Sequence, residues 1–304
     1  SLKRSIAEHH AKFYTINATR IAEDIGLGGR TNMIMQAAFF KLSEVLPLDE
    51  AIAHLKDSIV KSYGRKGEKV VNMNYEAVDK GIEELKEIKY PESWKDLKDE
   101  KEEKKETTKF FEEIAEVMNA QKGDTLPVSK FVGIEDGTFE NGTAKFEKRA
   151  IAVNLPKWHK ENCIQCNQCS YICPHAVIRP ILLNDEEAAK APETFETIEA
   201  KGKGLEGLQY RMQVSSLDCT GCGNCADICP AKEKALEMVH FEDIAEVESE
   251  NWDFAMDEVE VKDELMDKFS VKGSQFQQPL LEFSGACAGC GETAYAKLIT
   301  QLYG

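Results

Sequence analysis

The 304-residue sequence has no run of 18 or more apolar residues, which excludes a membrane-spanning helix. Its first residues, SLKRSIAEHH, contain no apolar core of a signal peptide. It also lacks an excess of basic charge, because it contains 38 Lys and Arg but 54 Asp and Glu, which gives a formal net charge of −16. Nucleic-acid phosphates demand clustered Lys and Arg, so the composition excludes nucleic acid as the principal partner. An acidic surface instead steers protein partners.

Cysteine is present and is concentrated. Eight of the ten cysteines fall into two runs, CIQCNQCSYICP at 163–174 and CTGCGNCADICP at 219–230. Both have the C-x₂-C-x₂-C-x₃-C-P spacing by which bacterial ferredoxins hold two [4Fe–4S] clusters. Neither run has a histidine between its cysteines, which disfavours structural zinc. With 42% hydrophobic residues the chain can build cores without a disulfide framework. The runs therefore predict an electron carrier.

The fourth cysteine of such a run ligates the other cluster. The predicted ligands are Cys163, Cys166, Cys169 and Cys229 for the first cluster, and Cys219, Cys222, Cys225 and Cys173 for the second. Gly221 and Gly223 allow the backbone to approach a sulfur closely. The predicted shielding residues are Ile164, Tyr171, Ile172 and Ile228. His175 and Arg179 either tune the potential or have a structural role. Thiolate ligands and oxygen-sensitive clusters indicate a reducing cytosol.

The remaining pattern predicts helices and a few strands. Before the cysteine runs we expect a strand at 11–16 and helices at 18–25, 33–46, 49–63 and 74–88, of which the helix at 33–46 is expected to be buried. A solvated linker or exposed helix is expected at 91–109. An apolar helical stripe from Phe110 to Met118 and a small β element over 126–156 should follow. Beyond them we expect an insertion at 180–212 that packs on a neighbouring domain or partner, a closing strand at 235–241, a wrapping segment at 242–272 and a helix at 293–302. GLGG at 26–29 lacks the G-x-G-x-x-G spacing and is interpreted as a helix end followed by a turn.

Cys287 and Cys290 form a separate pair in SGACAGCGET at 284–293. A C-x-x-C pair alone is compatible with a redox dithiol, half of a metal site, or no function. Its spacing does not decide between these alternatives.

The order of several segments resembles the pyruvate:ferredoxin (flavodoxin) oxidoreductases, which are single-chain 2-oxoacid oxidoreductases. The segments are IGLGGRTNMIMQAAFFKL (25–42), YGRKGEKVVNMN (63–74), LPVSKFVGIEDGTFENGTAKFEKRAIAVNLP (126–156), NCIQCNQCSYICPHAVIRP (162–180) and FSGACAGCGET (283–293). The resemblance covers essentially the whole chain. Together with the abrupt first and last residues, it predicts an internal fragment of such an enzyme.

The resemblance implies an α+β multidomain chain. Its expected parts are the C-terminal portion of a γ-like, coenzyme-A-associated α/β domain (1–90), a linker and small linking domain (91–155), a bacterial ferredoxin-like domain with two [4Fe–4S] clusters (156–245), a linking segment (246–282) and the start of a thiamine-pyrophosphate domain (283–304).

The resemblance also implies that Cys287 and Cys290 supply half of the ligands of a third [4Fe–4S] cluster. Glu292 either approaches thiamine pyrophosphate in the full enzyme or is a carboxylate at a helix start. The family's G-D-G…N motif for thiamine pyrophosphate and Mg²⁺ is absent, and EDGT at 135–138 is interpreted as a turn. Thiamine pyrophosphate, Mg²⁺ and the third cluster are therefore expected in the full enzyme only. No catalytic residue is predicted within this chain.

The implied reaction converts pyruvate and coenzyme A to acetyl-CoA and CO₂, with electrons passing to ferredoxin or flavodoxin. The resemblance further implies a cytoplasmic homodimer of anaerobic metabolism. The chain by itself would relay electrons and be inactive on pyruvate. An alternative hypothesis is a stand-alone ferredoxin-like electron-transfer subunit of another oxidoreductase. The sequence does not distinguish pyruvate from another small 2-oxoacid.

Overall fold

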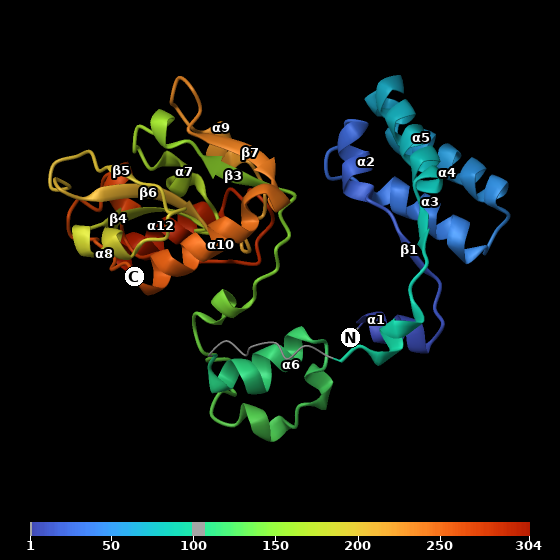
Figure 1. The fold of residues 1–304 in the computed structure, drawn as a ribbon, viewed down its shortest axis with the longest axis horizontal. Helices are drawn as coiled ribbons and strands as arrows, with labels where there is room; N and C mark the ends of the chain where they lie inside the picture. The colour runs from blue at the N-terminus through green and yellow to red at the C-terminus, as the bar shows by residue number, and fades with distance from the viewer. Residues whose placement is uncertain (1, 99–106) are drawn as a thin grey trace. The chain divides into compact units, whose positions relative to one another are not determined.

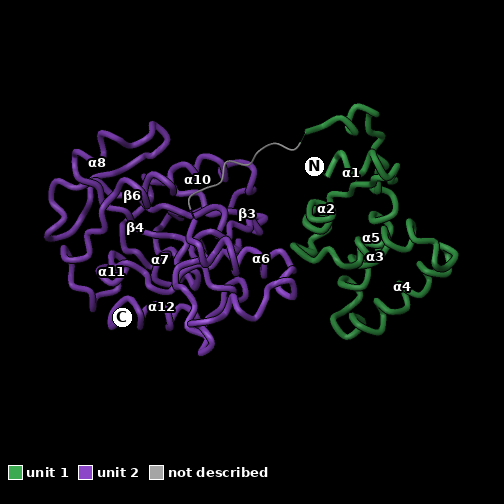
Figure 2. The backbone as a smooth tube through the Cα atoms, turned by 90° about the horizontal axis from the view of Figure 1, so that it is seen from below, with its two compact units in different colours: residues 1–105 green, residues 106–304 purple. Residues whose placement is uncertain are grey.

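The structure is a computed structural model that describes residues 2–98 and 107–304, and the chain divides into two units, 1–105 and 106–304 (Figures 1 and 2). Each unit has its own buried core. Helices and short antiparallel strands occur in both, in agreement with the expected mixed helix and sheet content. Within the described ranges, no helix is both long enough and apolar enough to cross a bilayer.

The first unit is a helical cluster with a two-stranded antiparallel ribbon. Its elements are α1 (Leu2–Glu8), β1 (Phe13–Thr15), α2 (Ala18–Asp24), α3 (Asn32–Ser43), α4 (Leu48–Tyr63), α5 (Glu68–Glu83) and β2 (Lys86–Ile88). In the ribbon, Phe13 of β1 pairs with Ile88 of β2. Gly81 permits α3 and α5 to approach closely, because a Cβ there would lie 2.6 Å from the carbonyl oxygen of Ile34. These contacts build a core that is separate from the cysteine runs.

Two expectations for this unit are wrong in detail. The helix predicted at 33–46 is not wholly buried, because Phe39 is 57% exposed while Ile34 on the opposite face is fully buried against α5. The helix predicted at 74–88 begins earlier and ends at Glu83, and Ile88 lies in β2. Pairing with β1, which is distant in sequence, overrides the local helical pattern.

The second unit begins with short helical turns. A π-helical turn spans Phe111–Ala115 and continues into α6 (Glu116–Asn119), and 3₁₀ turns follow at Gly123–Thr125, Val128–Phe131 and Thr143–Phe146. The apolar stripe packs in part as predicted, because Phe111 and Ile114 are buried and the Phe111 ring lies 5.0 Å from that of Phe146, whereas Met118 is exposed. The β element expected over 126–156 is wrong except at its end. Positive φ angles at Gly133, Gly137 and Gly142 break the segment into turns. Of the segment predicted at 91–109, residues 99–106 lie outside the described residues.

The rest of the unit surrounds two antiparallel sheets. β3 (Asn154–Trp158) pairs with β7 (Leu236–His240), and the second sheet has the order β4 (Ile178–Leu183), β6 (Gln209–Val214), β5 (Ile198–Glu199). Its helices are α7 (Gln168–Ile172), α8 (Asp185–Lys190), α9 (Asn224–Asp227), α10 (Phe241–Asp257), α11 (Val271–Ser274) and α12 (Thr293–Tyr303). The first cysteine run follows β3 directly, and the second precedes β7. Because β3 and β7 are paired, this sheet brings the two runs together.

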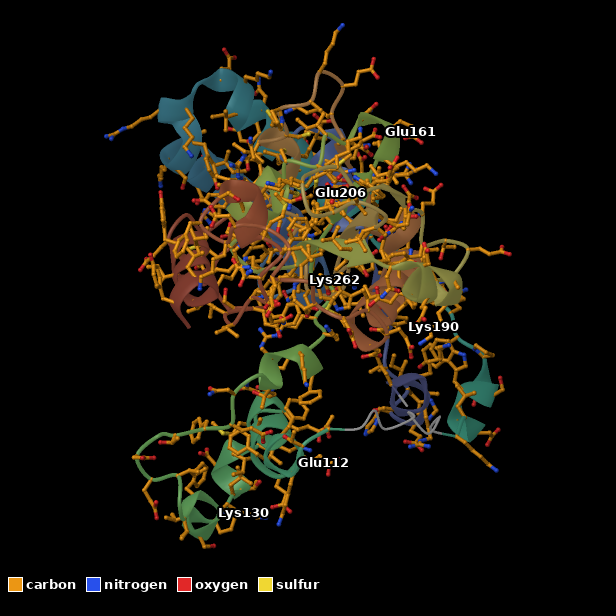
Figure 3. All side chains as sticks on the ribbon, turned by 90° about the vertical axis from the view of Figure 1, so that its left-hand side faces the viewer. Glu112, Lys130, Glu161, Lys190, Glu206 and Lys262 are labelled. Carbon is orange, nitrogen blue, oxygen red and sulfur yellow. The ribbon has the colours of Figure 1, made fainter. Side chains whose placement is uncertain are left out.

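The insertion expected at 180–212 and the wrapping segment expected at 242–272 both have a different structure from the one predicted. The insertion completes the β4–β6–β5 sheet, and the later segment contains α10, which packs on β6 (Figure 1). Arg211 of β6 donates from Nη2 to both carboxylate oxygens of Glu248 in α10, at 3.0 and 3.1 Å. Lys262, which follows α10 and is labelled in Figure 3, forms an ion pair with Glu187 of α8 at 2.7 Å. The insertion is therefore part of the core. The predicted strand at 235–241 and helix at 293–302 are confirmed as β7 and α12.

Candidate metal centres

Four cysteines line a first cavity. Cys163, Cys166 and Cys169 come from the first run, and Cys229 comes from the end of the second run. The cavity has an empty volume of about 330 Å³. The other lining residues are Trp158, Ile164, Gln165, Asn167, Tyr210, Met212, Pro230, Ala235 and Leu236. Most of these side chains are apolar, so the wall of the cavity limits access of water to the four sulfurs.

A second cavity has the reciprocal composition. Cys219, Cys222 and Cys225 come from the second run, and Cys173 comes from the end of the first. The empty volume is about 360 Å³. The other lining residues are Pro156, His175, Val177, Ile178, Thr220, Gly223, Asn224 and Met238. The structure thus brings together both predicted sets of four cysteines, each as three from one run and one from the other.

The donor sets fit a cluster better than a single ion. All ten cysteines are free thiols. Among the residues that the structure describes, no three His, Cys, Asp or Glu side chains converge closely enough to hold one metal ion. Tetrahedral zinc requires its ligands within about 2.3 Å of one point. Four thiols spread around a cavity instead suit an iron–sulfur cube, whose corners lie apart from one another. The ligation itself stays a prediction.

Burial keeps several of these thiols protonated in the absence of a cation. It raises the pKa of the Cys219 thiol to about 12 and raises the pKa of the Cys169 and Cys225 thiols well above the ordinary range. These cysteines therefore lack the low pKa of reactive or catalytic cysteines. Metal binding would supply the positive charge that holds them as thiolates. Backbone N–H groups of Gly221 and Ala235 already lie 3.4 Å from the sulfurs of Cys219 and Cys229, where they can donate.

The two cysteine loops curl at matching positions by different means. In the second loop Gly221 and Gly223 have positive φ, and in the first loop the corresponding residues are Gln165 and Asn167, with φ of 57° and 61°. Gln165 is anchored through its side chain, which donates to the Glu199 carbonyl at 2.8 Å and accepts from the Lys201 N–H at 2.7 Å. The side-chain amide of Asn167 donates to the carbonyl of Lys272 at 3.0 Å and accepts from the Tyr210 hydroxyl at 2.8 Å. Neither anchor was predicted from the sequence, although the alignment of the two runs pairs both residues with glycines.

The predicted shielding residues are only partly at the cavities. Ile164 lines the first cavity yet is 57% exposed. Tyr171, Ile172 and Ile228 are absent from the linings of both cavities. Shielding comes instead from strand residues that sequence analysis missed. They are Trp158 and Met212 at the first cavity and Ile178 and Met238 at the second.

Two ring nitrogens at the cavities have no partner. Trp158 Nε1 and His175 Nε2 are buried and make no hydrogen bond to any described residue. Trp158 lines the first cavity and His175 the second. Buried polar groups in native structures are nearly always paired. An orphaned nitrogen at each cavity is therefore further support for an acceptor within it.

Arg179 has a structural position. Its guanidinium forms an ion pair with Glu282 and lies over the rings of Trp252 and Phe283, at 4.9 and 5.6 Å from their centroids. It is not part of either cavity lining. Of the two roles considered for Arg179, the contacts favour fastening the 282–283 segment to β4 and α10.

Cys287 and Cys290 lie on a more exposed loop before α12. A Cβ at Gly289 would lie 3.4 Å from Cβ of Cys222, so the loop contacts the second cysteine run. Hydrogen bonds from the Thr293 side chain and from the N–H groups that open α12 lower the pKa of Cys290. Glu292 directly precedes α12, and its contact with a cofactor stays a prediction.

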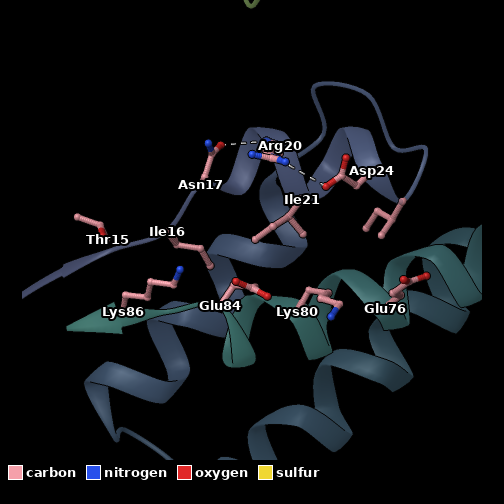
Figure 4. A pocket seen from close by; sticks show the side chains of 11 residues that line it. Thr15, Ile16, Asn17, Arg20, Ile21, Asp24, Glu76, Lys80, Glu84 and Lys86 are labelled. Carbon is pink, nitrogen blue, oxygen red and sulfur yellow. Dashed lines mark hydrogen bonds and ion pairs between the residues drawn. The ribbon is translucent and has the colours of Figure 1, made fainter. Parts of the chain in front are cut away.

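A further hollow lies in the first unit, between α2, α5 and the ribbon (Figure 4). Its cations are Arg20, Lys80 and Lys86, and its acids are Asp24, Glu76 and Glu84. Arg20 already lies 3.9 Å from Asp24, and Lys80 pairs with Glu83 at 3.2 Å. The balanced charges do not select an anionic or cationic ligand.

Comparison with protein-family models agrees with the geometry. Residues 162–268 match a 4Fe-4S double cluster binding domain, residues 2–84 match pyruvate ferredoxin/flavodoxin oxidoreductase, and residues 97–152 match a domain of unknown function. The first of these matches contains both cysteine runs. The class that the fold and the site define is therefore an iron–sulfur protein with a double-cluster domain.

Relatives cover the whole chain. A pyruvate:ferredoxin oxidoreductase of Moorella thermoacetica is 59% identical over 304 residues, and a pyruvate-flavodoxin oxidoreductase of Enterobacter agglomerans is 54% identical over 304 residues. Each match includes 100% of this chain and 26% of the relative. A mitochondrial pyruvate dehydrogenase [NADP(+)] of Euglena gracilis is 47% identical over 99% of this chain and 16% of its own length. Over its whole length the chain is homologous to pyruvate:ferredoxin/flavodoxin oxidoreductases, and it spans about a quarter of the length of the first two relatives. The resemblance stated from the sequence is confirmed.

Proposed function

We propose that this chain is the electron-relay portion of a pyruvate:ferredoxin oxidoreductase and holds two [4Fe–4S] clusters. The observation that carries the proposal is the reciprocal lining of the two cavities, in which three cysteines of one run meet the fourth of the other. This is the ligand pattern of two-cluster ferredoxins. The proposed ligands are Cys163, Cys166, Cys169 and Cys229 for the first cluster, and Cys219, Cys222, Cys225 and Cys173 for the second.

Each cluster, when bound, carries one electron at a time. The protein residues hold the sulfurs, direct N–H groups toward them and exclude water. Gly221 and Ala235 provide backbone N–H groups near Cys219 and Cys229. Such hydrogen bonds stabilise the more negative, reduced state and therefore raise the reduction potential.

Cys287 and Cys290 are proposed as two ligands of a third cluster, completed by residues outside this chain. The contact of Gly289 with Cys222 supports a route in which electrons pass from that cluster to the second cavity and then to the first. Glu292 is proposed to approach thiamine pyrophosphate. Residues 283–304 would then open the thiamine-pyrophosphate domain, and residues 1–90 would close the γ-like domain.

For the whole protein we propose the reaction of pyruvate with coenzyme A to give acetyl-CoA, CO₂, two electrons and a proton. Thiamine pyrophosphate with Mg²⁺, held by parts beyond this chain, supplies the carbon chemistry. Ferredoxin or flavodoxin is the proposed electron acceptor, as the names of the relatives suggest. A homodimer and a cytoplasmic location complete the proposal.

The direct test is anaerobic reconstitution of the chain with iron and sulfide. We expect about eight irons and eight sulfides per chain, as two [4Fe–4S] clusters require. The dithionite-reduced protein should be reoxidised by ferredoxin or flavodoxin and should form no acetyl-CoA from pyruvate. A colourless protein that takes up zinc in preference to iron would overturn the proposal.

Thiol alkylation of the cluster-loaded protein tests the separate status of Cys287 and Cys290. Coordination protects the eight thiolates of the cavities, so mass spectrometry should find two modified cysteines per chain, Cys287 and Cys290. The Cys287→Ser/Cys290→Ser double variant is the matched control, which should show no modification and an unchanged iron content. Modification of cavity cysteines in the loaded protein would contradict the ligand assignment.

The alternative, a stand-alone electron-transfer subunit of another oxidoreductase, is not favoured. Residues 2–84 match the pyruvate ferredoxin/flavodoxin oxidoreductase model, and they contain no cysteine. A simple carrier would not require this segment.

A further inference from the structure

Two buried nitrogens at the cavities are without hydrogen-bond partners among the described residues. They are Nε1 of Trp158 and Nε2 of His175. Leaving a buried polar atom unpaired destabilises a protein, so native proteins rarely keep one without a reason. Among the described residues, one other buried side-chain atom lacks a hydrogen-bond partner, Oε1 of Gln301. This atom is an acceptor, and Gln301 lines neither cavity. Both orphaned nitrogens of the described residues therefore coincide with the cysteine cavities, one at each.

Trp158 is held firmly at the first cavity. It ends β3 opposite Leu236 of β7, and both residues line the cavity. The guanidinium of Arg211 lies 5.8 Å from the indole centroid, and the Tyr210 ring lies 6.3 Å away. An indole nitrogen can only donate. Its partner must therefore be an acceptor, and we place that acceptor in the cavity that Trp158 lines.

His175 has the corresponding place at the second cavity. It follows Cys173 by two residues and is 2% exposed. Its Nδ1 lies 3.1 Å from both the carbonyl oxygen and the hydroxyl oxygen of Ser284. The carbonyl oxygen of Ser284 can only accept, whereas its hydroxyl can also donate, so the ring proton is on Nδ1 in one tautomer and on Nε2 in the other. We take the tautomer in which the hydroxyl donates to Nδ1 and Nε2 carries the proton. That N–H then has no protein acceptor and can donate to an acceptor in the cavity.

We propose that Trp158 Nε1–H and His175 Nε2–H each donate an N–H···S hydrogen bond to a sulfur of the cluster in their own cavity. This inference rests on the proposed two-cluster function. Reduction adds one negative charge to a cluster, so a donor at its sulfur stabilises the reduced form more than the oxidised form. Each residue therefore raises the potential of its own cluster and leaves the other cluster unchanged. Both are positioning residues, because neither is a ligand.

The variants separate hydrogen bonding from packing. Trp158→Phe removes the N–H at the first cavity, and Trp252→Phe is the matched control, because Trp252 is a buried indole of the same unit that lines neither cavity. At the second cavity His175→Phe removes the N–H. His175→Gln retains an amide N–H at a similar distance and should restore the potential.

The principal measurement is the midpoint potential of each cluster, from redox titration followed by electron paramagnetic resonance. We expect about a tenfold shift of the reduction equilibrium, equivalent to about 59 mV for one electron, toward lower potential. Trp158→Phe should shift one step of the titration, and His175→Phe should shift the other. Trp252→Phe should shift neither.

Spectroscopy of the wild-type protein tests the Trp158 hydrogen bond even if a variant does not incorporate its clusters. Protein labelled with ¹⁵N in the indole nitrogens of its three tryptophans should show a ¹⁵N hyperfine coupling to a reduced cluster. Variants with about eight irons but unchanged potentials, or the absence of that coupling in wild type, would overturn the proposal while leaving the two-cluster function intact. Failure of wild type to bind two clusters would instead overturn the function.

Discussion

The two cysteine loops have the same spacing and the same positions of positive φ, yet they reach this shape differently. The second loop uses glycine at 221 and 223, where a left-handed backbone has little steric cost. The first loop places Gln165 and Asn167 at those positions, and both side chains are almost fully buried. A left-handed conformation costs an ordinary residue roughly 1–2 kcal/mol. The first loop must offset that cost by other contacts.

Those contacts come from segments far along the chain. Gln165 is bonded to the backbone of Glu199 and Lys201, and Asn167 is bonded to Tyr210 and Lys272. The first loop is thus fastened to the insertion and to α11, which a compact ferredoxin would not need. The second loop depends on close backbone approach, because a Cβ at Gly221 would lie 2.9 Å from the carbonyl oxygen of Asn154. The first cysteine loop therefore depends on side-chain hydrogen bonds to distant segments, and the second depends on having no side chain at 221.

The largest expected effect is the loss of one cluster by removal of the crossing ligand. Cys229→Ser should release the first cluster although Cys229 belongs to the second run, and Cys173→Ser should release the second. Iron should fall from about eight to about four per chain, since each cluster holds four irons.

Alkylation identifies which cluster has gone. In Cys229→Ser the more accessible cysteines of the first cavity, Cys163 and Cys166, should become reactive, while the exposed but coordinated Cys222 of the second cavity stays protected. The reverse pattern would show that each run holds its own cluster. Cys287→Ser is the control and should retain the iron of both cavities.

A smaller effect is expected from adding a methyl group to the glycine loop. Gly221→Ala meets both a positive φ and the Asn154 carbonyl oxygen, whereas Gly223→Ala has the positive φ but no heavy atom within 4 Å of its Cβ. We expect Gly223→Ala to destabilise the loop by roughly 1–2 kcal/mol from backbone strain alone, and Gly221→Ala to destabilise it more.

The rate at which the second cluster loses iron under mild denaturant measures this difference. Gly221→Ala should release iron faster than Gly223→Ala, with the first cluster unaffected in both. Equal rates would mean that the approach of Asn154 does not constrain the loop.

The two groups of four cysteines could be predicted from the sequence because cluster ligation depends on local spacing. It did not predict the anchors of Gln165 and Asn167, since their partners lie 34 to 105 residues away. Trp158 was also missed, because nothing in NLPKW distinguishes an indole beside a cluster from one in a core. Only β3–β7 pairing brings it to Cys163 and Cys229.

The errors of fold have the same cause. The segment 126–156 is rich in apolar residues that suit strands, but its glycines turn the chain before a partner strand can pair. The helix α10 was missed within an acidic stretch. Its stability depends on buried contacts such as the Arg211–Glu248 ion pair, which sequence periodicity does not display.

The helix that connects the two cavities, α7, has a buried lysine packed against it. Lys297 of α12 is 1% exposed and donates from Nζ to the carbonyl oxygen of Ser170 at 2.6 Å and to Gln275 Oε1 at 3.3 Å. It therefore lies beside the segment that leads from Cys169 of the first cavity to Cys173 of the second. Burial lowers the pKa of Lys297 to about 8, from an ordinary value of 10.5, although the nearby Cys173 opposes the shift.

The lowered pKa predicts a pH-dependent stability. Below pH 8 the folded protein keeps a buried ammonium group, whose desolvation destabilises it. Between pH 8 and 10.5 only the unfolded chain binds this proton, so the stability of wild type relative to Lys297→Met should rise with pH and level off above 10.5. The full rise is roughly 3 kcal/mol, from 1.36 kcal/mol per pH unit over the shift.

The thermal midpoints of wild type and Lys297→Met, compared at pH values from 7 to 10.5, measure that rise, and a change of several degrees corresponds to it. Lys268→Met is the matched control, because exposed Lys268 also bonds a carbonyl of α12, that of Leu302 at 2.9 Å, while its ammonium group stays in solvent. Its difference from wild type should change little with pH. If the difference in thermal midpoint between wild type and Lys297→Met also stayed constant with pH, the ammonium group of Lys297 would be solvated. The packing of α12 against α7 would then be looser than the buried hydrogen bonds that hold Gln165 and Asn167.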